Sequence, residues 1–326
     1  MKKYPSPRKV NFLVGRRLFV LGGALVASRA FAAKLPVIAK DKASDGVILA
    51  VKDLSPRFLD FYRAAEGRSP DERFALWKER YDFAAVPPTP EGEAMVRHML
   101  DAAWPRYSAA LPTIERGVAG MRPKPLSVAV RVASLLQATR PLQFSFVGYV
   151  GDFEINAFTS DNGDGPVVAA PIELSESVLA LTLPHEMTHA THMRIAHLAP
   201  GYERALGRLV FEEGLAMRAT RALVPGLSDA SYVGDPAWFQ AAMAQRVPIL
   251  RALRPLLAVR DGDTLFKYTM GQGATGRERE AYIAGWLVIG RLLAEGRTFP
   301  ELARIPEGQL PVLVGKTIDR LLSAPT

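Results

Sequence analysis

At residues 183–189 the chain reads Leu183-Pro184-His185-Glu186-Met187-Thr188-His189, the pattern His-Glu-x-x-His. Residues four apart lie on the same face of an α-helix, so a helix here would direct two imidazole rings at one metal ion. Glu186 follows one step round the helix, where a carboxylate can take a proton from water activated by a metal. The pattern predicts His185 and His189 as metal ligands and Glu186 as a general base. The alternative is a polar helix whose histidines only cap or pack.

Helical periodicity surrounds this stretch on both sides. From residue 54 to about residue 137, apolar residues recur at three- and four-residue spacing, as at Phe58, Phe61 and Tyr62. Between residues 142 and 174, short runs rich in β-branched and aromatic residues alternate with glycine-rich turns. The helical pattern then returns almost to the C-terminus. We therefore predict an α+β fold, mostly helical, with a small mixed β-sheet above the helix that carries the histidines.

The N-terminal 32 residues differ in composition from the rest of the chain. They contain seven lysines and arginines and no acidic residue. Arg16-Arg17 precedes an apolar run, residues 18–27, that is too short to span a bilayer, and Ala30-Phe31-Ala32 offers small residues to a signal peptidase. Residues 1–32 thus predict a cleavable signal of the twin-arginine type, recognised by the twin-arginine export machinery, and a periplasmic or secreted protein. An uncleaved anchor or a chance basic N-terminus is the alternative.

Without this leader, the formal charge of +8 falls to 8 − 7 = +1, so a nucleic-acid partner is not expected. The chain has no cysteine, which excludes disulfides, thiolate metal sites and a cysteine nucleophile. We expect no stable membrane span after signal removal. The remaining residues, 33–326, are predicted to form a single domain, with a helical part over 33–141, the small sheet over 142–174 and a second helical part over 175–326.

A second acidic motif follows on the next predicted helix, residues 204–223, where the chain reads Phe211-Glu212-Glu213-Gly214-Leu215-Ala216. Together with His-Glu-x-x-His, it resembles the gluzincin zinc metallopeptidases, whose third ligand is the glutamate of a Glu-Gly-x-Ala motif on the following helix. Glu213 stands at the matching position, and Glu212 is its nearby competitor. The resemblance implies one zinc ion per chain on His185, His189 and Glu213, with one coordination position left for water.

Two further segments are similar to gluzincin features. Asn156-Ala157-Phe158 resembles the upstream segment in which an edge strand pairs with the substrate backbone, which implies that Asn156 and Ala157 bind substrate. Tyr282, 282 − 213 = 69 residues after Glu213, resembles the tyrosine that hydrogen-bonds the developing oxyanion. The alternatives are an ordinary buried strand and a packed core tyrosine.

In order, the segments between residues 53 and 296 are similar to a small bacterial family of predicted Zn-dependent proteases. The resemblance implies a two-lobed cleft, a peptide or protein substrate and hydrolysis by metal-activated water. The Gly-x-Met-Glu-Asn signature of gluzincin aminopeptidases is missing, which favours an endopeptidase. Two other readings remain open: a non-catalytic periplasmic metal-binding or chaperone-like protein of the same fold, and a structural protein with a chance motif.

Four residues within or near the motif also bear on these expectations. Pro184 lacks a backbone N–H, so it predicts a kink or the start of the helix at this point. A metzincin would need a third histidine at position 195, where the chain has Ile195, and that class is excluded. His192 and His197 are expected to face solvent.

Overall fold

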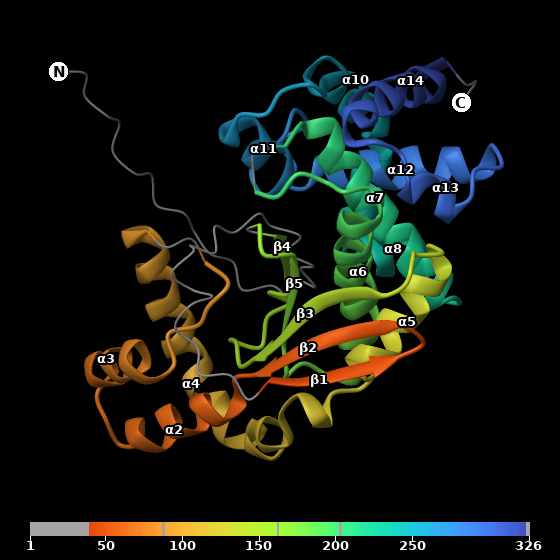
Figure 1. The fold of residues 1–326 in the computed structure, drawn as a ribbon. Coiled ribbons are helices and arrows are strands. Elements are labelled where there is room, and N and C mark those ends of the chain that lie inside the picture. Colours follow the sequence, from red (N-terminus) through yellow and green to blue (C-terminus); the bar gives the residue numbers. More distant parts are fainter. Residues whose placement is uncertain (1–38, 87–88, 162, 202–203, 324–326) are drawn as a thin grey trace.

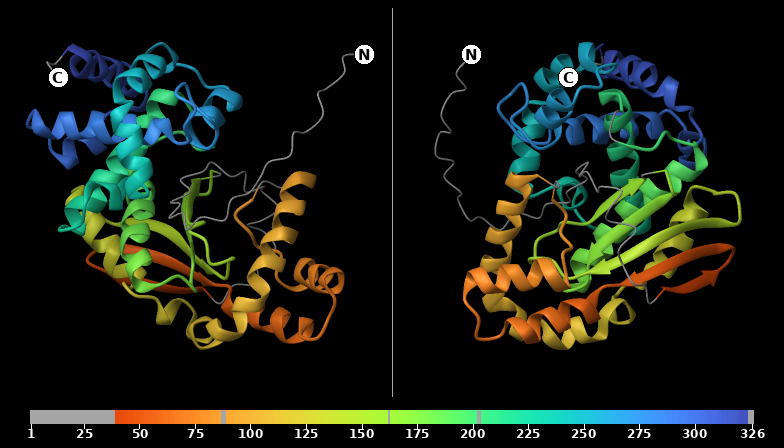
Figure 2. Two further views of the ribbon diagram at one scale, coloured as in Figure 1. Left: turned by 180° about the vertical axis from the view of Figure 1, so that it is seen from behind. Right: turned by 60° about the vertical axis from the view of Figure 1, so that its left-hand side comes forward.

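The structure, a computed structural model, describes residues 39–86, 89–161, 163–201 and 204–323. Most of these residues are helical, and five strands form one mixed sheet (Figures 1 and 2), which confirms the α+β class. The predicted leader, residues 1–32, lies outside the described residues. None of the described helices is both long and apolar enough to cross a bilayer.

The sheet has the strand order β1-β2-β3-β5-β4. Its central strands β2, β3 and β5 run parallel, and the two edge strands pair antiparallel with their neighbours. The strands are β1 (Ala39–Ser44), β2 (Val47–Asp53), β3 (Leu142–Tyr149), β4 (Phe158–Asp161) and β5 (Pro166–Pro171). The last three lie in the segment predicted to form the sheet.

Strands β1 and β2 were not predicted, because residues 33–141 were expected to be helical. Asp45 and Gly46 connect them with φ angles of 47° and 68°, the positive values that a two-residue hairpin turn requires. Residues 47–51, Val-Ile-Leu-Ala-Val, then form a strand that pairs with β3, far along the chain. The Asp-Gly pair ahead of a β-branched run was a usable hairpin signal.

Four helices follow the hairpin: α2 (Ser55–Ala65), α3 (Pro70–Arg80), α4 (Pro90–Gly120) and α5 (Pro125–Leu135). The periodic residues of α2 are buried, and the Phe58 ring packs edge-on against Tyr81 and Tyr107 with centroids 5.3 and 4.8 Å apart. Helix α4 kinks at Gly117, where φ is 53°. A Cβ atom there would lie 2.1 Å from Asp53 Oδ2, so only glycine lets this turn approach the end of β2.

The C-terminal half is built around helix α7, which packs against α6, α12 and α14. Helices α5 and α6 pack on the sheet and on each other. The helices are α6 (Glu176–Ile195), α7 (Leu206–Leu223), α8 (Asp229–Val233), α9 (Pro236–Ala244), α10 (Arg246–Leu253), α11 (Gly262–Thr269), α12 (Glu280–Ala294), α13 (Phe299–Ala303) and α14 (Leu310–Ser323), with short 3-10 turns at Arg254–Leu256 and Glu307–Gln309.

Two glycines bring α7 and α12 close together. A Cβ atom on Gly214 would lie 2.2 Å from the carbonyl oxygen of Gly285, and one on Gly285 would lie 2.4 Å from the carbonyl oxygen of Val210. The two backbones therefore touch at this crossing, which no larger residue allows. Because Glu213 immediately precedes Gly214 and Tyr282 lies one turn before Gly285, this contact also sets the positions of both side chains.

Candidate metal centre

Helix α6 carries the histidine pair through the interior of the protein. The Ser175 hydroxyl caps the helix by accepting from the Val178 N–H, so the helix begins well before Pro184. The expectation that Pro184 marks the helix start is wrong. Every residue from Thr182 to His192 is buried, although this stretch contains several polar side chains. Buried polar groups cost free energy unless they are paired or bind a ligand.

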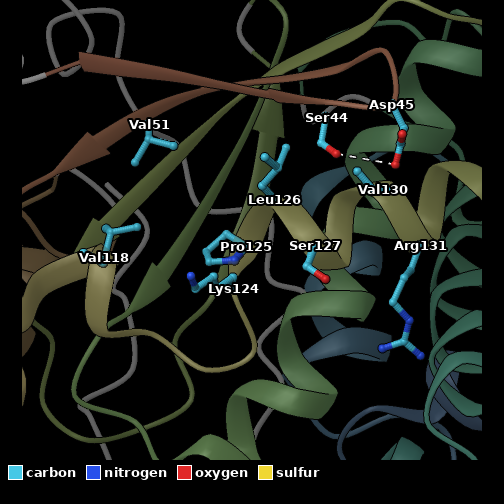
Figure 3. A pocket seen from close by; sticks show the side chains of 11 residues that line it. Ser44, Asp45, Val51, Val118, Lys124, Pro125, Leu126, Ser127, Val130 and Arg131 are labelled. Atoms are coloured by element: carbon cyan, nitrogen blue, oxygen red, sulfur yellow. Dashed lines mark hydrogen bonds between the residues drawn. The ribbon is translucent and has the colours of Figure 1, made fainter.

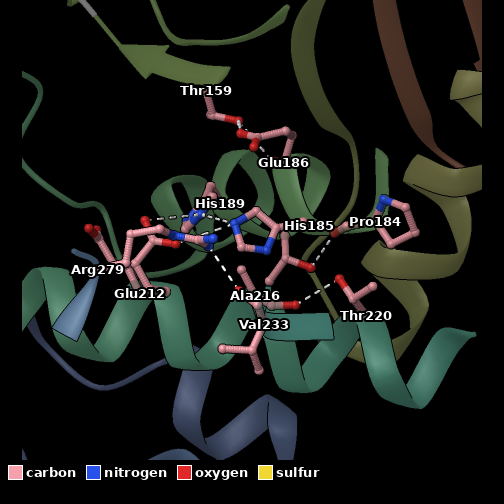
Figure 4. Close-up of polar contacts among 12 residues, drawn as sticks. Thr159, Pro184, His185, Glu186, His189, Glu212, Ala216, Thr220, Val233 and Arg279 are labelled. Carbon is pink, nitrogen blue, oxygen red and sulfur yellow. Dashed lines mark hydrogen bonds and ion pairs between the residues drawn. The ribbon is translucent and has the colours of Figure 1, made fainter. Parts of the chain in front are cut away.

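His185, His189 and Glu213 form one buried group that could hold a metal ion. Figure 4 shows the two histidines side by side. The two Nε2 atoms are 3.1 Å apart. Glu213 Oε2 lies 3.3 Å from His185 Nε2, and Glu213 Oε1 lies 3.7 Å from His189 Nε2. All three residues are at most 6% exposed. Side chains from two different helices thus converge on one point, as the resemblance implied.

The spacing of these donor atoms suits a small metal ion. Ligands bound tetrahedrally at typical zinc distances are roughly 3.3 Å from one another, and the three observed separations fall on either side of this value. Glu213 Oε2 is buried, and apart from its 3.3 Å contact with His185 Nε2 it has no hydrogen-bond partner among the described residues. Two imidazoles and one carboxylate are also a ligand set that zinc accepts. The residues present therefore fit a zinc ion.

The two adjacent glutamates of α7 have different partners. Glu212 accepts from Arg204 Nη1 at 2.7 Å and from Arg208 Nε at 2.8 Å. Burial would raise the pKa of Glu212, but these arginines hold it below the ordinary value. Burial likewise opposes ionisation of Glu213, yet the histidines hold its pKa well below its usual range. Glu213 faces the histidines, and Glu212 is occupied elsewhere.

Glu186 lies on the β4 side of α6. Its Oε2 is 2.8 Å from the hydroxyl of Thr159, a residue of β4 (Figure 4). Its Oε1 is buried and has no hydrogen-bond partner among the described residues. Burial raises the pKa of Glu186 to about 7, although the nearby His185 and the Thr159 hydroxyl act in the opposite direction. The sequence offered no signal for Thr159, because only the fold brings β4 over α6.

Tyr282 is 2% exposed near the start of α12. Burial, followed by the negative charges of Glu213 and Glu186, raises the pKa of its phenol well above the ordinary value. The phenol thus lies within electrostatic reach of the cluster. The guanidinium of Arg279, 4.3 Å from the Tyr282 ring centre, is a second neighbour of the site that the sequence did not indicate.

Asn156 and Ala157 do not lie on a strand, because β4 begins at Phe158. The Asn156 side chain donates to Asp152 Oδ1 at 2.8 Å, and its backbone carbonyl accepts from the Tyr149 hydroxyl at 2.6 Å. These bonds hold the segment in a loop before β4. The edge strand that the resemblance implied at Asn156 and Ala157 therefore begins only at Phe158, and the Asn156 amide has an internal partner.

Of the two histidines expected to face solvent, one does and one does not. His197 is exposed, but His192 is 1% exposed and packs against the Phe211 ring with centroids 5.8 Å apart. Burial lowers the pKa of His192 to about 4, so this imidazole is neutral at physiological pH. The expectation for His192 was wrong because α7 covers this face of α6.

The protein also has a pocket that lies apart from the histidine cluster. A pocket of about 520 Å³ opens between the β1–β2 hairpin and α5 (Figure 3). Its lining includes Val51, Leu126 and Val130, together with the charged residues Asp45, Lys124 and Arg131. It contains no histidine, and none of its charged side chains is buried.

No protein-family model, curated protein or solved structure matches this chain. Function is therefore inferred from the residues of the cluster and from the elements that position them.

Proposed function

We propose that the protein is a zinc-dependent hydrolase of peptide bonds. One observation carries the proposal: a buried His185–His189–Glu213 group lies beside the free carboxylate oxygen of Glu186. A protein that only stored or carried a metal would need the three ligands, but it would not need a further carboxylate directly beside them, as Glu186 is beside His185. The free oxygen of Glu186 costs free energy in the folded state, and general-base catalysis explains why it is kept.

His185, His189 and Glu213 would hold the zinc ion. When bound, zinc polarises the scissile carbonyl and acidifies a water molecule. Glu186 Oε1 takes the proton from the attacking water and later delivers it to the leaving amine. The Thr159 hydroxyl, bonded to Glu186 Oε2, orients the carboxylate so that Oε1 is the oxygen available for this transfer.

Two further roles follow from the neighbours of the cluster. The raised pKa of Tyr282 keeps its phenol protonated, so it can donate a hydrogen bond to the developing oxyanion. Among the described strands, β4 pairs with β5 alone and forms the edge of the sheet. Its other edge would pair with the extended backbone of a peptide in the two-lobed cleft expected for a gluzincin. Asn156 and Ala157, just before β4, would lie at the start of this edge.

Metal content and hydrolysis separate this proposal from its alternatives. The protein, purified without a histidine tag, is measured by elemental mass spectrometry and assayed against a mixture of peptides, beside Glu186→Gln and His189→Ala. We expect about one zinc ion per chain in the wild type and in Glu186→Gln, and none in His189→Ala. Hydrolysis should fall by about 100-fold or more in Glu186→Gln.

The other outcomes each have a clear meaning. Full zinc content with no Glu186-dependent hydrolysis would favour the non-catalytic metal-binding protein. A folded wild type without stoichiometric metal would leave the motif as a chance match.

We also propose that residues 1–32 direct export by the twin-arginine pathway to the periplasm or beyond. Fractionation of cells that express the full chain should find the wild type outside the cytoplasm. Replacement of both Arg16 and Arg17 by lysine should retain the protein inside. Export of both forms to the same extent would rule out this route.

A further inference from the structure

Two arginines are almost fully buried among the described residues, Arg208 at 2% and Arg279 at 7% exposure. Arg208 is neutralised by two carboxylates, with Nε 2.8 Å from Glu212 and Nη1 2.9 Å from Glu307. Arg279 makes no ion pair with any carboxylate in the described part of the chain. Its Nη2 donates to the Val233 carbonyl at 2.9 Å, and its Nε is buried without a partner.

Arg279 is flanked in the sequence by Glu278 and Glu280, and Glu280 does not supply the missing charge. The Glu280 carboxylate accepts from the backbone N–H groups of Ala274 and Thr275 and from the Thr275 hydroxyl, at 2.7 to 2.8 Å. Its oxygens thus bind the preceding loop. A buried cation without a counter-charge is costly, so the Arg279 guanidinium, which has no ion pair within the described residues, is suited to binding an anion.

The backbone at Arg279 is also unusual. Its φ and ψ angles are 63° and 31°, the left-handed conformation, at the residue that precedes α12. This conformation is unfavourable for a non-glycine residue and tends to be kept where it serves a site. Here it places the guanidinium 4.3 Å from the ring centre of Tyr282 and 5.4 Å from that of Trp238.

Arg279 shares a neighbour with the metal centre. The Arg279 guanidinium lies 4.3 Å from the Tyr282 ring centre, and the negative charges of Glu213 and Glu186 raise the pKa of the same phenol. Figure 4 shows the Arg279 side chain with its hydrogen bond to Val233. An anion on the guanidinium would therefore lie next to the group proposed to bind the oxyanion.

We infer that Arg279 binds a carboxylate of the substrate close to the scissile bond, so that the enzyme selects peptides with a carboxylate at that place. The inference rests on the proposed function. A planar guanidinium with free N–H groups can bind a carboxylate through two parallel hydrogen bonds. The carboxylate can be the C-terminus of a peptide or the side chain of an aspartate or glutamate.

Equilibrium binding tests this inference without hydrolysis. Titration calorimetry is performed on Glu186→Gln, with and without added zinc, using two matched pairs of ligands. Benzoyl-Gly-Phe is compared with its C-terminal amide, and benzoyl-Gly-Asp-amide with benzoyl-Gly-Asn-amide. The same titrations are repeated after Arg279→Met and Arg279→Lys, and after Arg251→Met, which removes an exposed arginine as a control.

We expect at least one carboxylate ligand to bind about 10- to 100-fold more tightly than its neutral partner, as hydrogen bonds to charged groups allow. Arg279→Met should abolish this preference and leave the neutral ligands unaffected, and Arg251→Met should preserve it. Arg279→Lys, which keeps the charge without the planar fork, should retain only part of it. The pair that shows the preference identifies the source of the carboxylate.

Equal affinity within both pairs would overturn the inference, even if the protein hydrolyses peptides. So would a carboxylate preference that survives Arg279→Met. Failure of the proposed function is seen separately, as hydrolysis that does not depend on Glu186 or as absence of zinc. Should Arg279→Met fail to fold, as judged by circular dichroism, the comparison with Arg279→Lys decides the question.

Discussion

Adjacent carboxylates of one helix serve different purposes at the residue scale. Successive residues of an α-helix point about 100° apart, so Glu213 faces His185 and His189 while Glu212 lies between Arg204 and Arg208. The first arrangement provides ligands, and the second neutralises buried charge. Substitution of the two glutamates should therefore have separable effects.

Glu213→Gln should abolish stoichiometric zinc binding and leave most of the stability of the metal-free protein intact. Glu212→Gln should keep the zinc but lower the free energy of unfolding by about 3 kcal/mol, because two arginines lose their shared partner inside the protein. Elemental analysis and urea denaturation of both variants measure the two effects. Loss of zinc from Glu212→Gln in folded protein would show that the roles are assigned the wrong way round.

Glu173, just after β5, is a buried carboxylate outside the metal centre. Its Oε1 accepts from the backbone N–H groups of Gly151 and Phe153, and its Oε2 has no partner. Burial raises its pKa from the ordinary value of 4.5 to about 7. The folded state therefore holds this proton more tightly than the unfolded state does, and stability falls as the pH rises between these two values.

Glu173→Gln should remove this cost. We expect the variant and the wild type to be equally stable near pH 4.5, and the variant to be more stable by about 1–2 kcal/mol at pH 8, where the wild-type carboxylate is ionised. Urea denaturation at both pH values gives the difference. A stability difference that does not change with pH would contradict the assignment of the raised pKa to this residue.

At the scale of elements, the crossing of α7 and α12 determines where the site residues lie. The backbone contact at Gly214 and Gly285 leaves no space for a methyl group. Gly214→Ala should therefore separate the helices, lower the free energy of unfolding by about 2–3 kcal/mol and weaken zinc binding through displacement of Glu213. Calorimetric unfolding and zinc titration measure these changes.

The matched control for this prediction is Gly262→Ala, at the first turn of α11. A Cβ atom there meets nothing within 4 Å, and its φ is not positive. Its effect on stability should stay within about 0.5 kcal/mol. Comparable losses at both positions would mean that the crossing is not tightly packed at Gly214.

At the scale of the whole molecule, zinc binding should stabilise the fold. The ligands come from α6 and α7, and such a site exists only when these helices are packed together, so a metal that binds the folded state shifts the unfolding equilibrium. Free zinc at 100 times its dissociation constant should add about 2.7 kcal/mol. Thermal unfolding in zinc and in a chelator measures this gain, and Glu213→Gln should lose it. An equal gain in that variant would point to binding elsewhere.

Short-range features of the chain were predictable from sequence. The α+β class, the later strands and the helices around residues 183–189 and 204–223 follow from periodicity and turn residues, which act over a few positions. The hairpin of β1 and β2 was not predicted, although the pair Asp45-Gly46 is typical of a hairpin turn. Residues 33–53 were instead expected to continue the helical pattern that begins after them.

The site was only partly predictable. The spacing of His185 and His189 determined by itself that both rings share one helix face, because the helix period is a local property. Only the tertiary structure decided that Glu213 rather than Glu212 faces them, that Thr159 contacts Glu186, and that the buried Arg279 lies beside Tyr282. These contacts join residues from four separate elements, and their geometry depends on how the helices rotate and pack, which no local stretch of sequence encodes.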